Sequence, residues 1–243
     1  SNMTHYFHIT SDNIARLQRV DIPNVWGHIN IVASGAGQAI AQLDVNWGVD
    51  YEPFKDHPPS EWGHFGVRRC NHELMVRGTF ANARLKNAVA PGTEGPITKH
   101  MPDGAQMTIF EASEQYQQAG TPCVIFGGDD YGMGSSRDWA AKGVQLLGVK
   151  AVIVKSFERI HRSNLIGVGI APLLFAEGQT FESLGLDGSE SYDFDGLAAG
   201  LDGTTAIKVD ARRADGTSIG FDVRADVRSA AEADLLRRGG MFQ

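Results

Sequence analysis

Cysteine is scarce in this sequence: Cys70 and Cys123 are the only two among 243 residues, and neither belongs to a CxxC pair. Two thiolates are too few for the cysteine set of an iron–sulfur cluster. A disulfide between them is not expected in a cytosol-type protein. We therefore interpret both cysteines as structural thiols.

Long apolar runs are also missing. No segment approaches the roughly 20 residues needed to span a bilayer, and no charged-then-apolar secretory signal opens the chain. These absences predict a cytoplasmic protein with no membrane partner. Residues 1–2, which precede Met3, resemble an expression scar and are left out of the fold reasoning.

An excess of positive charge is absent as well. The net charge is −7, and charged residues of both signs are dispersed along a chain that is 42% hydrophobic. Dispersed charge at this hydrophobicity excludes a disordered chain and suits one compact domain, or a domain with an extension. The acidic balance argues against a dedicated nucleic-acid binder, which usually carries a basic face.

The second half of the chain alternates apolar runs with helical patterns. Strands are expected at 124–126, 151–154 and 170–175, the last interrupted at Pro172, and helices at 136–147 and 158–165. A β-hairpin is expected from 205–210 and 218–223 around Ala214-Asp215-Gly216. This order predicts α/β architecture with largely parallel central strands and a C-terminal hairpin.

The first half is less regular. Leu74-Met75-Val76 predicts a strand, 85–100 a loop, Pro102-Asp103-Gly104 a turn, and Ile109 to Gln118 a helix that Gly120 ends. Near the N-terminus, a short strand is expected at 6–9, a helical turn at 12–19 and a glycine-rich loop at 33–38.

The most informative stretch is GDDYGMGSSRDWAAKG, residues 128–143, which follows an apolar strand and leads into a helix. The first N–H groups of a helix lack partners within it and favour an anion, and glycines let a ligand approach the backbone. Ser135 and Asp138 have capping-box spacing. Arg137 would lie in the first turn, where a cation is unfavourable to the helix dipole, and a bound carboxylate or phosphate would explain its presence. The alternative is that a serine only caps the helix and that Arg137 is solvated.

The helix after this loop is expected to bury one face, made of Trp139, Ala140, Gly143, Val144 and Leu147. The loop lacks both the GxxxxGK[ST] and the GxGxxG patterns, which disfavours a nucleotide as the anion.

Three motifs then resemble the C-terminal domain of aconitases: NHELMVRGTFAN at 71–82, YGMGSSRDWAAKG at 131–143 and SFERIHRSNLIGVG at 156–169. The resemblance is strong over 66–175 and returns in LLRRGG at 235–240. GSSR alone would also suit the small subunit of isopropylmalate isomerase, whereas RDWAAKG and RGTFAN favour the aconitase side. The resemblance implies a swivelling β/β/α domain over 66–243, with 3–65 as an N-terminal extension packing on it.

The resemblance also implies site residues. Ser135 is similar to the base that moves the substrate proton, Ser136 and Arg137 to ligands of a substrate carboxylate, and Arg77 of RGTFAN to a second carboxylate clamp. Guanidinium groups match carboxylates bidentately, so these roles are chemically sensible. An ordinary serine is a poor base, so Ser135 would need anion stabilisation from the helix N-terminus and Arg77.

Two departures from the family pattern affect these assignments. The family's Thr-Thr-Asp-His-Ile-Ser motif has its nearest counterpart at 9–14, with asparagine for the histidine and, directly after the stretch, alanine for the serine. Asp12 there either matches the active-site aspartate or only caps a helix. Cys70 stands where the family has the glycine of Arg-Arg-Gly-Asn, and it is not in the position of a cluster ligand. The histidines are interpreted as structural or surface residues because they lack close metal-ligand spacing; those considered are His72, His100 and His161.

The resemblance implies a lyase of the tricarboxylic acid cycle, a hydratase that interconverts citrate and isocitrate through cis-aconitate. Its [4Fe–4S] cluster would be bound by partner domains outside this chain, and the chain alone would be inactive. A 2-methylcitrate dehydratase or a homoaconitase-like enzyme remains an alternative, as does a non-catalytic copy. A further alternative is an RNA-binding module using a basic strip, formed by Arg68, Arg69, Arg77, Arg84 and Lys86.

Overall fold

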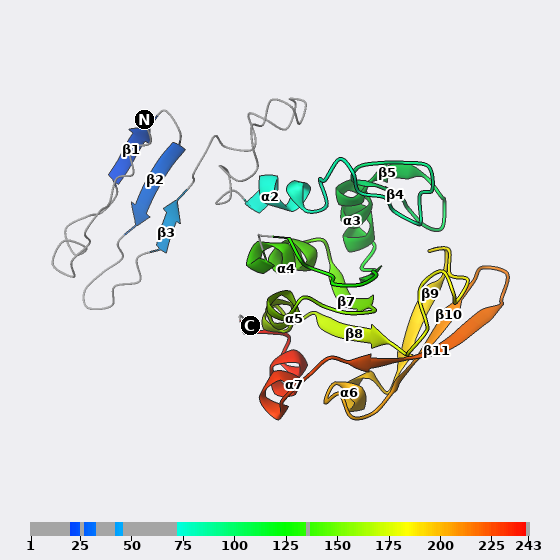
Figure 1. Cartoon of the computed structure of the whole chain (residues 1–243). Helices are drawn as coiled ribbons and strands as arrows, with labels where there is room; N and C mark the ends of the chain where they lie inside the picture. Colours follow the sequence, from blue (N-terminus) through cyan, green and yellow to red (C-terminus); the bar gives the residue numbers. More distant parts are fainter. Residues whose placement is uncertain (1–19, 25–26, 33–41, 46–71, 135–136, 242–243) are drawn as a thin grey trace. The chain divides into compact units, whose positions relative to one another are not determined.

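The structure is a computed structural model that describes residues 20–24, 27–32, 42–45, 72–134 and 137–241 (Figure 1). It divides into two compact units, Ser1–Gly78 and Thr79–Gln243. The expected domain division at 65/66 stays a prediction. The elements expected at 6–9, 12–19 and 33–38 lie outside the described residues.

The described residues of the first unit form a small antiparallel sheet and a helix. The sheet has the order β1-β2-β3, formed by Val20–Asn24, Gly27–Val32 and Gln42–Val45, with Ile31 opposite both Val20 and Leu43. The sequence analysis assigned no strands to this region.

The helix of the first unit, α2 (His72–Gly78), corrects a prediction, since a strand was expected at Leu74-Met75-Val76. Three apolar residues are too few to reveal a period of 2 or 3.6. Charges favour the helix: Glu73 lies in the first turn and Arg77 in the last, where each suits the helix dipole. The Arg77 side chain also donates from Nη1 to the carbonyl oxygen of Glu73, at 2.7 Å.

The second unit is built on a six-stranded mixed sheet with the order β6-β7-β8-β11-β10-β9. The strands β6 (Cys123–Phe126), β7 (Val149–Val154) and β8 (Ala171–Phe175) are parallel, and we call them the parallel half. The strands β9 (Ser191–Asp195), β10 (Ile207–Arg212) and β11 (Ser218–Ala225) form the antiparallel half, joined where β11 pairs with β8. The α/β class and the hairpin are thus confirmed, and the parallel strands make up half of the sheet.

Helices pack beside the parallel half. Figure 1 shows α4 (Arg137–Leu146), α5 (Arg159–Gly167) and α7 (Ala230–Arg237) stacked next to β7 and β8, in agreement with the contacts of α4 with β7 and of α5 with β8. The strand patterns follow from this cover. Five of the six β7 residues are buried, whereas β10 and β11 alternate between buried and more exposed positions because one face is packed.

Pro172 lies inside a continuous β8, so the expected interruption is wrong. Proline lacks an N–H, and its carbonyl oxygen accepts from Asp226 N at 2.9 Å. The opposite group, the Asp226 carbonyl oxygen, accepts instead from Nη1 of the buried Arg162, at 2.8 Å. An arginine side chain thus takes the hydrogen bond that a backbone N–H at 172 would otherwise make, and the strand continues.

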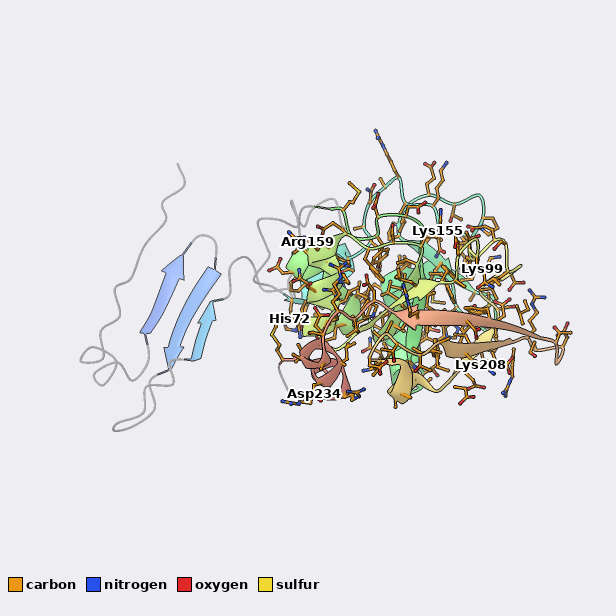
Figure 2. The ribbon with its side chains drawn as sticks, turned by 60° about the horizontal axis from the view of Figure 1, so that its bottom comes forward. His72, Lys99, Lys155, Arg159, Lys208 and Asp234 are labelled. Atoms are coloured by element: carbon orange, nitrogen blue, oxygen red, sulfur yellow. The ribbon has the colours of Figure 1, made fainter. Side chains whose placement is uncertain are left out.

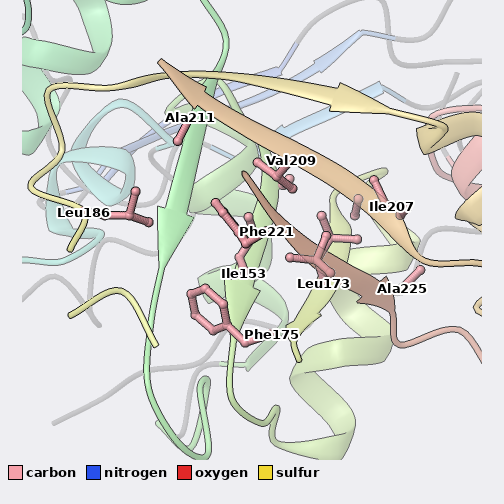
Figure 3. Close-up of a cluster of buried hydrophobic side chains, with 12 residues drawn as sticks. Ile153, Leu173, Phe175, Leu186, Ile207, Val209, Ala211, Phe221 and Ala225 are labelled. Carbon is pink, nitrogen blue, oxygen red and sulfur yellow. The ribbon is translucent and has the colours of Figure 1, made fainter. Parts of the chain in front are cut away.

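One hydrophobic core joins the two halves of the sheet (Figure 3). Ile153 of the parallel half and Ile207 of the antiparallel half are both 0% exposed. Leu173, also 0% exposed, pairs with Ile153 on one side and with Ala225 on the other. Leu173 is therefore at the junction of the two halves.

A smaller hairpin and a helix precede the sheet. β4 (Ile97–Lys99) and β5 (Gln106–Thr108) pair across the predicted turn at 102–104, so the predicted loop over 85–100 is wrong in its last residues. The helix α3 has the predicted bounds, Ile109–Gln118, since Thr108 and Glu111 form a capping box and Gly120 adopts a φ of 69° after its end. A single turn, α6 (Leu197–Gly200), follows β9. Among the described residues, no helix has the length and apolar character to cross a membrane.

Candidate active site

Residues 127–134, which we call the glycine-rich segment, begin where β6 ends. They run beside the residues that follow β7. Parallel strands place their carboxyl ends at the same edge of a sheet, where α/β proteins commonly bind ligands. Gly127 N donates to Ile153 O at 2.9 Å, and the Gly128 carbonyl oxygen accepts from Lys155 N at 3.1 Å. The backbone of one segment is therefore held by the other from its first residues.

Tyr131 is the centre of this pairing. Its N–H donates to Ser156 O and its carbonyl oxygen accepts from Glu158 N, both at 2.9 Å, so it forms an isolated parallel bridge with Phe157. Burial raises the pKa of the Tyr131 phenol far above its ordinary value, so it stays neutral. Beside it, Asp130 N donates to Ser156 Oγ at 2.7 Å.

The start of α5 lies next to the glycine-rich segment, since Glu158 N donates to Tyr131 O. Glu158 is the N-cap, and its Oε2 accepts from Ile160 N at 2.9 Å and from His161 N at 2.8 Å. The Lys155 ammonium before this turn pairs with Asp129 Oδ2 at 2.6 Å. Figure 2 labels Lys155 and Arg159, the residues on either side of the turn. The SFERIH motif thus supplies both a helix cap and a support for the neighbouring segment.

The helix α4 continues from the glycine-rich segment and is held by its buried face. Gly143, Val144 and Leu147 are buried as predicted, while Trp139 and Ala140 are half-buried. Ala141, which was not predicted, is 0% exposed. Gly143 lies against Thr79, since a Cβ added there would be 2.1 Å from Thr79 Oγ1. These contacts hold the second half of α4 against the rest of the second unit.

The structure describes only some of the predicted site residues. Arg137 is the first residue of α4, but its side chain is outside the described part, as are Ser135, Ser136 and Asp12. Arg77 is half-buried in the last turn of α2, which belongs to the first unit, whereas Arg137 belongs to the second. The roles assigned to these five residues therefore stay predictions.

Cysteine and histidine have separate structural settings. Cys123 is half-buried, and burial raises the pKa of its thiol, which keeps it protonated and unreactive; Cys70 lies outside the described residues. His100 Nδ1 is 2.9 Å from Asp103 Oδ1, and His72 is exposed. In the described ranges, no three His, Cys, Asp or Glu side chains come together as a metal site.

The sequence analysis missed one contact in this region. Gly132 lies directly against the ring of His161, which is 1% exposed and has its ring centroid 5.3 Å from that of Tyr131. The positive φ of Gly132, 93°, requires a glycine, but nothing in the sequence pairs it with a residue 29 positions later.

Together these features define an α/β domain in which a glycine-rich segment leads into a helix at the carboxyl edge of parallel strands. Residues 62–178 match the family model of the aconitase C-terminal domain. Over 191 residues the chain is 49% identical to aconitate hydratase A of Staphylococcus aureus (strain MW2), covering 78% of this chain and 21% of that protein. Over 188 residues it is 50% identical to aconitate hydratase A of Corynebacterium efficiens, covering 75% of this chain and 20% of that protein.

A solved structure of 3-isopropylmalate dehydratase from Methanocaldococcus jannaschii shares 20% identity, with a TM-score of 0.31, over 56% of this chain and 75% of that one. This likeness is too weak to add to the sequence matches. Residues 62–178 belong to the aconitase C-terminal domain family, as the three motifs predicted. The chain spans about a fifth of the length of the curated relatives it matches.

Proposed function

We propose that this chain is the substrate-clamping and base-supplying domain of an aconitase-type hydro-lyase that interconverts citrate and isocitrate through cis-aconitate. The observation that carries the proposal is the match of residues 62–178 to the aconitase C-terminal domain, together with a helix, α4, that begins directly after the Ser-Ser pair. Such an enzyme acts in the tricarboxylic acid cycle, and we expect it in the cytoplasm.

In this proposal the chain performs two tasks. Arg77 and Arg137, with Ser136, bind the carboxylates of the substrate, because guanidinium forks match carboxylates in charge and geometry. Ser135 takes the proton from the substrate carbon and returns it in the reverse direction. The N-terminal N–H groups of α4 would stabilise the negative charge that a serine base requires.

The [4Fe–4S] cluster is assigned to domains outside this chain. The described residues offer no group of cluster ligands, and the thiol of Cys123 is half-buried with a raised pKa. The proposed partner is therefore a cluster-bearing part, either in the same polypeptide or in a second subunit. We infer no step of the reaction that passes through the cluster itself, and Asp12 is retained as a second proposed catalytic residue.

The test is a comparison of the chain alone with the complete enzyme that contains the cluster-bearing part. The chain alone is expected to give no turnover of citrate, isocitrate or cis-aconitate. In the complete enzyme, Ser135→Ala should lower kcat by roughly 10²–10⁴-fold, the usual contribution of a general base. Arg137→Lys should mainly raise KM, since a lysine cannot make the bidentate contact.

Arg224→Lys is the matched control, because Arg224 is exposed on β11 in the antiparallel half. It should leave both constants unchanged. Turnover by the chain alone, or full turnover by Ser135→Ala, would contradict the proposal. Faster turnover of 2-methylcitrate or homocitrate than of citrate would identify a related dehydratase. No turnover of any of these substrates by the unmodified complete enzyme would identify a non-catalytic copy.

RNA binding is the remaining alternative. Lys86 of the basic strip pairs with Glu94, Nζ to Oε1 at 3.8 Å, which partly neutralises its charge within the domain. We do not propose this function. A gel-shift titration at moderate salt, in which no specific complex forms, would remove it.

A further inference from the structure

Gly132 of the glycine-rich segment packs directly against the ring of His161 in α5. A methyl group built on Gly132 would lie 2.2 Å from His161 Cγ and 2.3 Å from His161 Cδ2. Real carbon atoms do not approach so closely, so the imidazole ring is the surface on which the backbone at 132 rests. The ring therefore limits how closely the backbone at Gly132 can approach α5, one residue after the hydrogen bonds of Tyr131.

His161 is itself held firmly. It is 1% exposed in the first turn of α5, and its backbone N–H donates to the carboxylate of Glu158 at 2.8 Å. Its ring packs against that of Tyr131, which meets Phe157 edge-on with centroids 6.1 Å apart. A buried ring with packed neighbours cannot move without disturbing them, so the support beneath Gly132 is rigid.

Over the described residues before the predicted base, the chain goes from a held position to an exposed one. Tyr131 is hydrogen-bonded through both backbone groups, whereas Met133, two residues on, is 68% exposed. Ser135 follows Gly132 by three residues, so a shift of Gly132 reaches it through a short length of chain. Arg137, in contrast, belongs to α4, which is independently held by Ala141, Val144 and Leu147.

We propose that His161 is a positioning residue: its ring sets the location of the Gly132 backbone, three residues before the predicted base Ser135, and the rate of proton transfer depends on that support. It acts without touching the substrate. This inference rests on the proposed function, because Ser135 is the base only there. The two proposed tasks then have separate supports. His161 supports the segment that leads to the base, and the packing of α4 supports the helix that carries Arg137.

The distinguishing measurement is the division of effects between kcat and KM in the complete enzyme. His161→Ala removes the ring, and a misplaced base should lower kcat by about 10²-fold. KM should change by less than about threefold, since α4 keeps its own packing. His161→Phe keeps a planar ring beneath Gly132 and should recover most of kcat. A purely structural role would give His161→Ala and His161→Phe the same kcat.

A double-mutant cycle isolates the contact itself. Gly132→Ala introduces a clash with the ring and strain from its positive φ, but the strain is the same whether or not the ring is present. The loss of kcat caused by Gly132→Ala should therefore be at least about tenfold smaller in the His161→Ala background. Gly128→Ala is the matched control, because its added methyl group meets nothing within 4 Å.

Amide hydrogen exchange in the chain alone separates failure of this inference from failure of the proposed function. His161→Ala should speed exchange at Tyr131 N–H by about tenfold while β7 and β8 keep their protection. If Ser135→Ala leaves turnover intact, the proposed function fails, and exchange at Tyr131 still decides whether His161 holds the segment. If Ser135→Ala abolishes turnover but His161→Ala keeps kcat and protection, the inference is overturned.

His161→Ala could fail to fold, since the ring is buried. His161→Phe and Gly132→Ala then give the same test in folded protein. The first is expected to keep kcat and the second to lose it, with KM little changed in both. Full kcat in Gly132→Ala would overturn the inference.

Discussion

The parallel and antiparallel halves of the sheet share one core but differ in how they use charge. In the parallel half, helices cover the strands, and the ion pair between α5 and α7, Arg162 with Glu232, is largely shielded from solvent: the Arg162 side chain is 4% exposed. In the antiparallel half, Arg212 pairs with Asp193 and Asp210 on an exposed face. Burial makes an ion pair costly to break, whereas water screens an exposed one.

The two halves also differ in their relation to the predicted site. The Tyr131 bridge, the Gly132–His161 contact and the buried face of α4, which flank the predicted site residues in the sequence, all belong to the parallel half. The antiparallel half contributes Ile207, Val209 and Phe221 to the common core. Loops at one edge of a sheet are positioned by the packed scaffold beneath them, and the antiparallel half contributes to that packing through the common core.

The largest effect is expected where the halves join. Leu173→Ala removes a fully buried side chain that pairs with both halves, and should lower the free energy of unfolding by about 3–4 kcal/mol. Leu174→Ala, at the neighbouring half-buried position, should cost less. Urea unfolding of the two variants measures the difference in their free energies of unfolding. Equal free energies would show that the junction contributes no more to stability than its half-buried neighbour.

The next effect concerns the shielded ion pair. Glu232→Gln leaves the buried guanidinium of Arg162 without its carboxylate and should cost about 3 kcal/mol at neutral pH. The hydrogen bonds from Arg162 lower the pKa of Glu232, so the stabilisation is fully present above the ordinary glutamate pKa of about 4.3. It is lost as pH falls through the lowered pKa of the folded state.

The check is urea unfolding of the native chain and of Glu232→Gln between neutral and acidic pH. Their stability difference should be constant near neutrality and shrink below about pH 4, once the carboxylate of the unfolded and then of the folded protein is protonated. A difference that grows on acidification would contradict this sign.

The smallest effect is expected in the antiparallel half. Arg212→Ala breaks two ion pairs whose side chains are 39–66% exposed, and should lower the free energy of unfolding far less than Glu232→Gln does, because water screens exposed charges. Raising the salt concentration should reduce even this difference. A loss as large as that of Glu232→Gln would remove the proposed contrast between the halves.

Local signals explain what the sequence predicted correctly. The bounds of α3 were predicted because Thr108, Glu111 and Gly120 act within a few residues of the helix ends. The hairpin β10–β11 was predicted because alternation and Asp215-Gly216 occur in one short window. The errors arose where distant residues decide. Pro172 stays in a strand because Arg162 and Asp226 satisfy the hydrogen bonds around it.

The sequence by itself determined the α/β class, most elements of the second unit, and the resemblance of residues 66–175 to the aconitase C-terminal domain, which the family match over 62–178 confirms. Caps, periodicity and motifs are local or ordered along the chain. Only the tertiary structure decided that the imidazole of His161 supports Gly132, that Arg162 lets β8 continue through Pro172, and that the two halves meet at Leu173. These are contacts between residues far apart in sequence. Their free energy depends on burial and distance, which no local pattern records.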